Sequence, residues 1–177
     1  MFSMNQKVVY PGYGVAQISR IFEKKFGTQS SMFCELKFFN QDMTVMVPME
    51  KAIDIGIRPL SSAAYINRVL SSIPVKKNEM QELILSINWN KRSKGYQNRL
   101  KTGSLEDTFG IYSDLMLLSL TKTLSFGEKN LLQKTEILLV EEISAAENIE
   151  VGKAIEYLRS FFNKSHGSSY SSSHQMI

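Results

Sequence analysis

A basic stretch around the only tryptophan of the chain holds the residues best suited to binding chemistry. Between Trp89 and Lys101 the sequence carries no acid and five cations, which are Lys91, Arg92, Lys94, Arg99 and Lys101. If this stretch is helical, Lys91, Lys94 and Lys101 fall near one face. Cations attract a nucleic-acid backbone, and a large apolar side chain can occupy a disrupted base step. The stretch therefore favours nucleic-acid contact; the competing interpretation is a core tryptophan beside a solvated helix face.

Residues that could perform catalysis are sparse. His166 and His174 fall in the Ser- and Gly-rich end of the chain, without cysteine or acid partners nearby. Neither a Ser-His-Asp arrangement nor a metal site is therefore expected. Glu141 and Glu142 are interpreted as part of a solvated helix face rather than as an acid/base pair. We expect a protein that is not an enzyme and that needs no metal or cofactor.

Composition is that of a globular, mildly basic chain. With 177 residues, 43% hydrophobic content and a formal net charge of +4, it can bury the core of one domain or two small ones. The single cysteine, Cys34, excludes an internal disulfide and is expected to be a small buried residue. The sequence contains no signal-like start and no apolar run of membrane-spanning length. A cytoplasmic protein without membrane contact is the expectation.

The first sixty residues have the pattern of a small β domain. Short apolar runs separated by turn residues predict strands over 7–10, 14–22, 31–39 and 43–47, with a polar reversal over 23–28. Pro11, Gly12 and Gly14 suit a tight turn after the first strand. Short antiparallel strands of this kind predict an SH3- or Tudor-like barrel, partly open and with an exposed edge strand.

After Pro59 the apolar period changes to that of helices. We expect helix starts at five points: Ser61 or Ser62, Asn78, Ser104, Ser125 and Asn148, with the Asn78 helix running towards Trp89. Ser125 and Glu128 form an S-x-x-E capping box. The apolar faces predict a compact helical bundle and an α+β fold overall. The predicted division is a β domain over 1–60, a helical domain over 61–163 and a disordered Ser-rich tail over 164–177.

Four motifs in this order resemble the CarD/CdnL family of bacterial transcription regulators. They are the opening Val8-Val9-Tyr10-Pro11-Gly12-Tyr13-Gly14-Val15, the later Met43-Thr44-Val45-Met46-Val47-Pro48, Asn88-Trp89-Asn90-Lys91-Arg92, and Leu124-Ser125-Phe126-Gly127-Glu128-Lys129. The resemblance extends from about Lys7 to Phe162.

The resemblance implies how such a protein would act. Family members dock a Tudor-like domain on the RNA polymerase β subunit by pairing an exposed strand, which here corresponds to Thr44, Val45, Met46, Val47 and Pro48. Their tryptophan, here Trp89, wedges into the minor groove near the −10 element and stabilises the open complex, beside the basic residues Lys91, Arg92 and Lys94. A monomer that associates with the nucleoid through polymerase is expected.

Two positions differ from the usual family pattern. Many relatives carry arginine where this sequence has Met46, so that charged polymerase contact is either missing here or supplied by Lys24, Lys25 or Lys37, and Met46 offers apolar surface instead. Many also carry an aromatic residue in place of Ser93, for which Tyr96 is a candidate substitute. The alternative function is a polymerase-binding adaptor whose helical half binds protein; on that hypothesis Trp89 would be buried.

Overall fold

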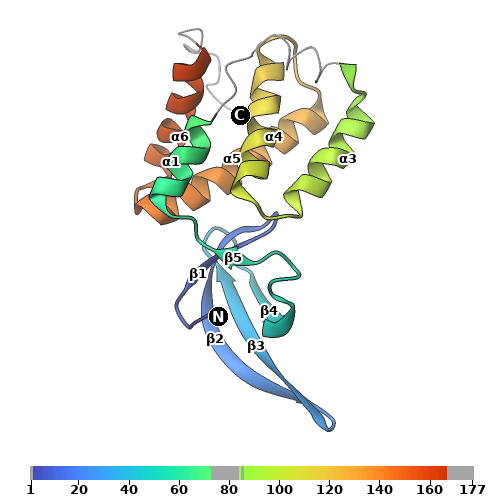
Figure 1. The fold of residues 1–177 in the computed structure, drawn as a ribbon, viewed down its shortest axis with the longest axis vertical. Helices are drawn as coiled ribbons and strands as arrows, with labels where there is room; N and C mark the ends of the chain where they lie inside the picture. The colour runs from blue at the N-terminus through green and yellow to red at the C-terminus, as the bar shows by residue number, and fades with distance from the viewer. Residues whose placement is uncertain (1, 73–83, 85, 167–177) are drawn as a thin grey trace.

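The structure is a computed structural model that describes residues 2–72, 84 and 86–166, and it places a β-sheet at one end and a group of helices at the other (Figure 1). Its β elements are β1 (Lys7–Tyr10), β2 (Gly14–Phe26), β3 (Gln29–Phe38), β4 (Thr44–Pro48), the short 3-10 helix η1 (Met49–Lys51) and β5 (Arg58–Pro59). Its helices are α1 (Ala63–Ser71), α3 (Trp89–Leu100), α4 (Leu105–Ser119), α5 (Phe126–Glu147) and α6 (Val151–His166). The predicted α+β class is confirmed.

The five strands form one antiparallel sheet in the order β4-β3-β2-β1-β5. No pairing joins β4 to β5 among the described residues, so the sheet is open and a closed barrel is not seen. Buried residues of β1, β2, β3 and β4, together with Ala52 and Ile57, form its core, and Cys34 lies within it as predicted. The turn between β1 and β2 depends on Gly12 and Gly14, whose φ angles are 72° and 97°.

Strands β2 and β3 are longer than the sequence pattern indicated. Most of the predicted polar reversal is strand, because Glu23 pairs with Met32 and Lys24 with Ser31, beyond Phe33, which pairs with the last residue of β4, Pro48. The stacked rings of Phe22 and Phe33, with centroids 6.2 Å apart, lie at the base of this two-stranded extension and stabilise it. Figure 1 shows it as an arm that projects away from the helices.

Three of the predicted helix starts are confirmed. Ser62, Ser104 and Ser125 cap α1, α4 and α5, and each side-chain oxygen accepts a hydrogen bond from a backbone N–H in the first turn. At Ser125 the full capping box is present, with Glu128 reaching back to the Ser125 N–H at 2.8 Å. The predicted start at Asn78 lies outside the described residues.

The predicted helix start at Asn148 is wrong. Asn148 ends α5 instead, in the left-handed conformation with φ 53°, and α6 begins at Val151. Asparagine tolerates this conformation, so the same residue type serves both kinds of helix boundary. Val151 is 50% exposed, whereas Ala154, Leu158 and Phe162 are buried. The helix continues to His166, past the predicted start of the tail at 164.

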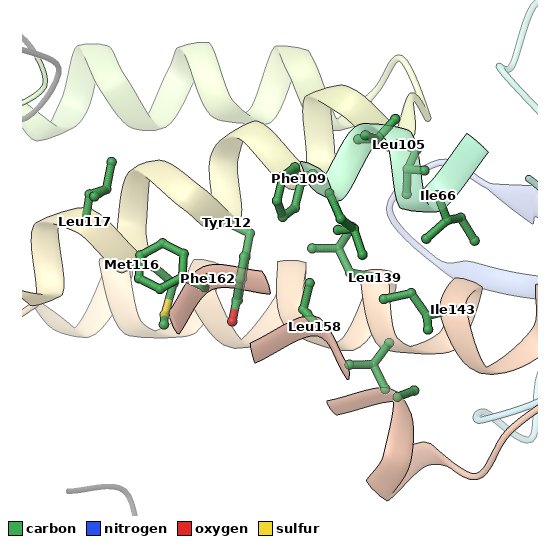
Figure 2. Close-up of a cluster of buried hydrophobic side chains, with 14 residues drawn as sticks. Ile66, Leu105, Phe109, Tyr112, Met116, Leu117, Leu139, Ile143, Leu158 and Phe162 are labelled. Atoms are coloured by element: carbon green, nitrogen blue, oxygen red, sulfur yellow. The ribbon is translucent and has the colours of Figure 1, made fainter. Parts of the chain in front are cut away.

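Helices α1, α4, α5 and α6 share the larger apolar core, shown in Figure 2. Tyr112 of α4 is fully buried and meets the Phe162 ring of α6 edge-on, with centroids 6.5 Å apart. A second core joins α3, α4 and α5 around Leu100, Leu115 and Leu131. Through this second core α4 and α5 position α3, the helix that carries the basic stretch. None of the helices described is both long enough and apolar enough to cross a membrane.

The sheet and the helices meet through α5, which lies against β2. Glu142 of α5 accepts two hydrogen bonds from the Arg58 guanidinium, at 2.6 and 2.8 Å, and a third from the Ser61 N–H at 3.2 Å. The neighbouring Glu141 accepts from the Val15 N–H at 3.1 Å. Both carboxylates are buried, so the expectation that they form a solvated helix face is wrong. The hydrogen bonds that the two glutamates accept from the β half fix the sheet against the helices.

Candidate nucleic-acid interface

Trp89 is the first residue of α3 and lies at the boundary between core and solvent. Asn88 caps the helix by accepting from the Asn90 N–H at 2.9 Å. The Trp89 side chain packs against the second helical core but is only partly buried. Its ring lies so close to Gly127 of α5 that a Cβ added there would stand 3.0 Å from the Trp89 Cζ2 atom. The tryptophan is therefore anchored on one side and accessible on another.

Arg92 does not extend into solvent with the other cations. Its side chain is buried, lies beneath the Trp89 ring with the guanidinium 5.5 Å from the ring centroid, and forms an ion pair with Glu128. It also donates to the carbonyls of Ile84 and Ile87, at 2.9 and 3.2 Å. Arg92 thus ties the start of α3 to the start of α5, and this geometry does not favour the predicted phosphate contact.

Glu128 is the acceptor at the centre of this arrangement. Besides Arg92, it accepts from Lys122 Nζ at 2.8 and 3.0 Å and from the Ser125 N–H. Burial alone would raise the pKa of this carboxyl group, but the hydrogen bonds from Lys122 and Ser125 outweigh it and hold the pKa below its ordinary value. The carboxylate therefore stays charged at neutral pH and can hold both cations.

Three lysines do form an exposed row along α3 and its C-cap residue, Lys101. Lys91, Lys94 and Lys101 are all exposed, and their spacings of three and seven residues place them along one stripe of the helix. Lys101 comes twelve residues after Trp89, which corresponds to about 18 Å along the helix axis at 1.5 Å per residue. The stripe is suited to contacts with successive phosphates rather than with a single one.

Arg99 is partly neutralised by acids of α4. Its Nε donates to Asp107 at 3.0 Å, and its guanidinium lies 3.7 Å from Asp114. Burial raises the pKa of Asp114, and the charge of Arg99 opposes that shift. Tyr96 is 4% exposed, with its pKa raised first by burial and then by Asp114, so it cannot replace a surface aromatic at Ser93. These residues hold α3 on α4.

The predicted polymerase-binding strand, β4, is an edge of the sheet. It pairs with β3 on one side, and no described residue pairs with its other side. Thr44 and Met46 are exposed and Val47 is buried, whereas Val45 and Pro48 are partly buried. Lys24, Lys25 and Lys37 are exposed as well; the first two lie on the arm beyond the end of β4. Sequence reasoning missed the interface role of Glu141 and Glu142, whose only signal is a charged pair between Val140 and Ile143.

The described residues include no cluster of three or more His, Cys, Asp or Glu side chains that could hold a metal ion. Two clefts lie along the junction between sheet and helices, with volumes of about 390 and 300 Å³. Glu141 lines both, and polar side chains such as Lys7 and Gln133 surround them. Neither contains the basic stripe or Trp89. The arrangement of α3 and β4 offers two candidate binding surfaces.

Comparison with known proteins gives matches over both halves. The family model described as the CarD-like/TRCF RID domain matches residues 2–61, and the model described as the CarD C-terminal domain matches residues 69–159. The candidate transcription factor YdeB of Bacillus subtilis (strain 168) is 26% identical over 149 residues, covering 84% of this chain and 94% of that protein. The solution NMR structure of the 72-residue N-terminal domain of Myxococcus xanthus CarD is 32% identical. It covers 33% of this chain and 79% of that one, with a TM-score of 0.30.

The match to the CarD C-terminal domain alone spans more than half of the chain, and the other family match takes up most of the remainder. The predicted resemblance is confirmed: this chain belongs to the CarD family and is a transcription regulator of the CarD/CdnL type.

Proposed function

We propose that this protein binds the RNA polymerase β subunit through β4 and contacts promoter DNA through the start of α3, thereby stabilising the open complex. The observation that carries the proposal is the position of Trp89. It lies partly exposed at the first turn of a helix whose outer stripe is Lys91, Lys94 and Lys101. A partly accessible indole beside a row of cations is suited to a minor-groove or base-step contact flanked by phosphates.

The polymerase contact is proposed to be β-augmentation. An edge strand has unpaired N–H and C=O groups that can accept another strand, and its outward side chains set specificity. The outer side of β4 meets this requirement, and Met46, which is 54% exposed, offers an apolar side chain there. Lys24 and Lys25 on the arm are placed to meet acidic groups of the same partner. The match to the CarD-like/TRCF RID domain supports this part of the proposal.

The mechanism is a shift in populations without chemistry. Docking through β4 would hold the helical half near the promoter, so that weak DNA contacts act at high effective concentration. The anchors from Glu141 and Glu142 to the β half would keep Trp89 at a fixed position relative to β4. A side chain that interacts with unstacked DNA and not with intact duplex favours the open state by that difference in affinity.

The polymerase contact is tested by binding measurements with Met46→Glu, since a charge at an exposed edge position leaves the sheet core intact. We expect weaker polymerase binding, while Ile53→Glu, a matched change at another exposed position of the β half, leaves binding unchanged. Equal binding by wild type and Met46→Glu would contradict the assignment of β4.

The DNA contact is tested by salt dependence. Each phosphate contact contributes roughly −0.9 to the slope of log K against log salt, so Lys91→Gln with Lys94→Gln should make the slope shallower by about 2. Lys153→Gln, a change at an exposed lysine of α6, serves as the control and should leave the slope unchanged. A slope unaltered by the double change would favour the adaptor alternative, which the burial of Arg92 and the partial burial of Trp89 also fit.

A further inference from the structure

Phe126 is the most exposed large hydrophobic side chain among the described residues, with 80% of its surface accessible. It is the first residue of α5. The fold makes little use of it, because Leu124 and Leu131 supply the buried contacts at this end of the helix and the capping box needs only Ser125 and Glu128. An isolated exposed phenylalanine would be unremarkable on a protein surface. Its surroundings set this one apart.

The backbone of Phe126 lies close to the tryptophan that carries the proposed DNA contact. The next residue, Gly127, lies against the Trp89 ring. A Cβ added to Gly127 would stand 3.0 Å from the Trp89 Cζ2 atom. Phe126 and Gly127 are consecutive, so their Cα atoms are about 3.8 Å apart. Two helices therefore begin side by side, and the first residue of each is aromatic: Trp89 in α3 and Phe126 in α5.

The neighbours of Phe126 on the helix are cationic or neutral. Lys129 and Asn130, three and four residues further along α5, are both exposed and share the face of Phe126. The only acid within that turn, Glu128, is buried and paired with Arg92 and Lys122. An exposed ring beside a cation and an amide, without an exposed carboxylate, matches what an unpaired base and its phosphate require of a protein surface. A partner with acidic and apolar side chains would meet the ring and Lys129 equally well, so the experiment must separate the two.

We propose that Phe126 is a second DNA-contacting aromatic residue, which stacks on an unpaired base next to the step that Trp89 occupies. Lys129 binds a backbone phosphate on the same strand. The proposal rests on the proposed function of Trp89 and extends it from one wedge to a pair of rings on adjacent helix starts. The fully exposed ring would reach an extruded base, whereas the anchored Trp89 ring would stay at the step itself.

The experiment measures open-complex lifetime at fixed salt with the full chain and its cognate polymerase. Phe126→Ala should shorten the lifetime roughly fivefold or more, as expected for the loss of one base–aromatic stack. Phe126→Tyr should keep the wild-type lifetime, and Phe126→Leu should not, because stacking needs a flat ring. Ile137→Ala, at a residue 49% exposed on the same helix, is the matched control and should have no effect.

An abasic scan of the promoter identifies the contacted base. At the position that stacks on Phe126, removing the base should abolish the difference between wild type and Phe126→Ala, and at other positions the difference should persist. The absence of any such position would overturn the proposal. So would a loss of polymerase binding by Phe126→Ala when no DNA is present, because the ring would then contact protein.

Trp89→Ala, measured in parallel, separates this inference from the function on which it rests. If Trp89→Ala shortens the lifetime and Phe126→Ala does not, the proposed function stands and the second aromatic contact is refuted. If neither variant changes the lifetime, the proposed function fails and the inference fails with it.

Discussion

Replacing Arg58 with alanine should destabilise the protein by weakening the junction between sheet and helices. Arg58 donates to both oxygens of Glu142, at 2.6 and 2.8 Å, and to the Gly103 carbonyl at 2.7 Å. In its absence the Glu142 side chain, 5% exposed, would keep only the Ser61 N–H among these donors. Removing one partner of a buried pair costs about 3–5 kcal/mol. Because the Arg58 side chain is 24% exposed, we expect the lower end, about 3 kcal/mol.

Chemical or thermal unfolding measures this loss, and a change of this size corresponds to a fall in Tm of roughly 6–12 °C for a chain of this length. Glu142→Ala and the double variant complete a cycle, in which we expect a coupling energy of about 2 kcal/mol. Glu136→Gln is the control, since its pair with Arg159 is more exposed, at 23% and 48%, and should contribute no more than about 1 kcal/mol. A loss from Arg58→Ala as small as that of the control would refute the view that this pair anchors the two halves.

Three further predictions concern Glu128 at the start of α5 and the glycines Gly14 and Gly95. Glu128→Gln should lower the free energy of unfolding by about 2 kcal/mol at neutral pH, because Arg92 and Lys122 lose their charged acceptor. The pKa of Glu128 is lowered in the folded state, so its stabilisation is complete above the ordinary value of 4.5 and is lost as pH falls. The stability gap between wild type and Glu128→Gln should therefore narrow in acid; a gap that widens would contradict the assigned shift. Gly14→Ala should destabilise by about 1–3 kcal/mol, because φ is 97° there and a Cβ would overlap the Glu141 carboxylate. Gly95→Ala, inside α3 with open space around it, should stabilise by about 0.5–1 kcal/mol, and equal effects of the two changes in unfolding experiments would show that the backbone argument is wrong.

Local signals in the sequence predicted local features of the fold. The Ser125–Glu128 capping box, the caps at Ser62 and Ser104 and the turn at Gly12 each depend on residues only a few positions apart, and all are present. The family was identified in the same way, because its motifs are short and occur in a fixed order.

Features that depend on distant residues were not predictable. Arg92 reads as one more cation of a basic helix, and only the fold brings it to Glu128, 36 residues away in the chain. In the sequence Glu142 has the pattern of a surface glutamate, and only the fold brings it to Arg58, 84 residues away in the chain. In both cases a charged side chain is buried because its partner comes from another element. The division of the basic stretch into an exposed lysine stripe and buried or paired arginines follows from these partners.

Boundary residues were ambiguous for a different reason. Asn148 can cap the start of a helix or adopt the left-handed conformation at its end, and the sequence around it does not distinguish the two. The lengths of β2 and β3 were underestimated because the charged run Glu23-Lys24-Lys25 has the composition of a turn. The two-stranded arm accommodates these residues because each of its side chains can reach solvent.

The most direct test of the account is the lifetime of a promoter open complex formed by the cognate polymerase, with wild-type protein and with Trp89→Ala at the same salt concentration. We predict that the wild type prolongs the lifetime, and that Trp89→Ala loses most of this effect, a factor of roughly five to one hundred, while still binding polymerase. Equal lifetimes with the two proteins would contradict the account, because Trp89 would then be only a packing residue of the helical core.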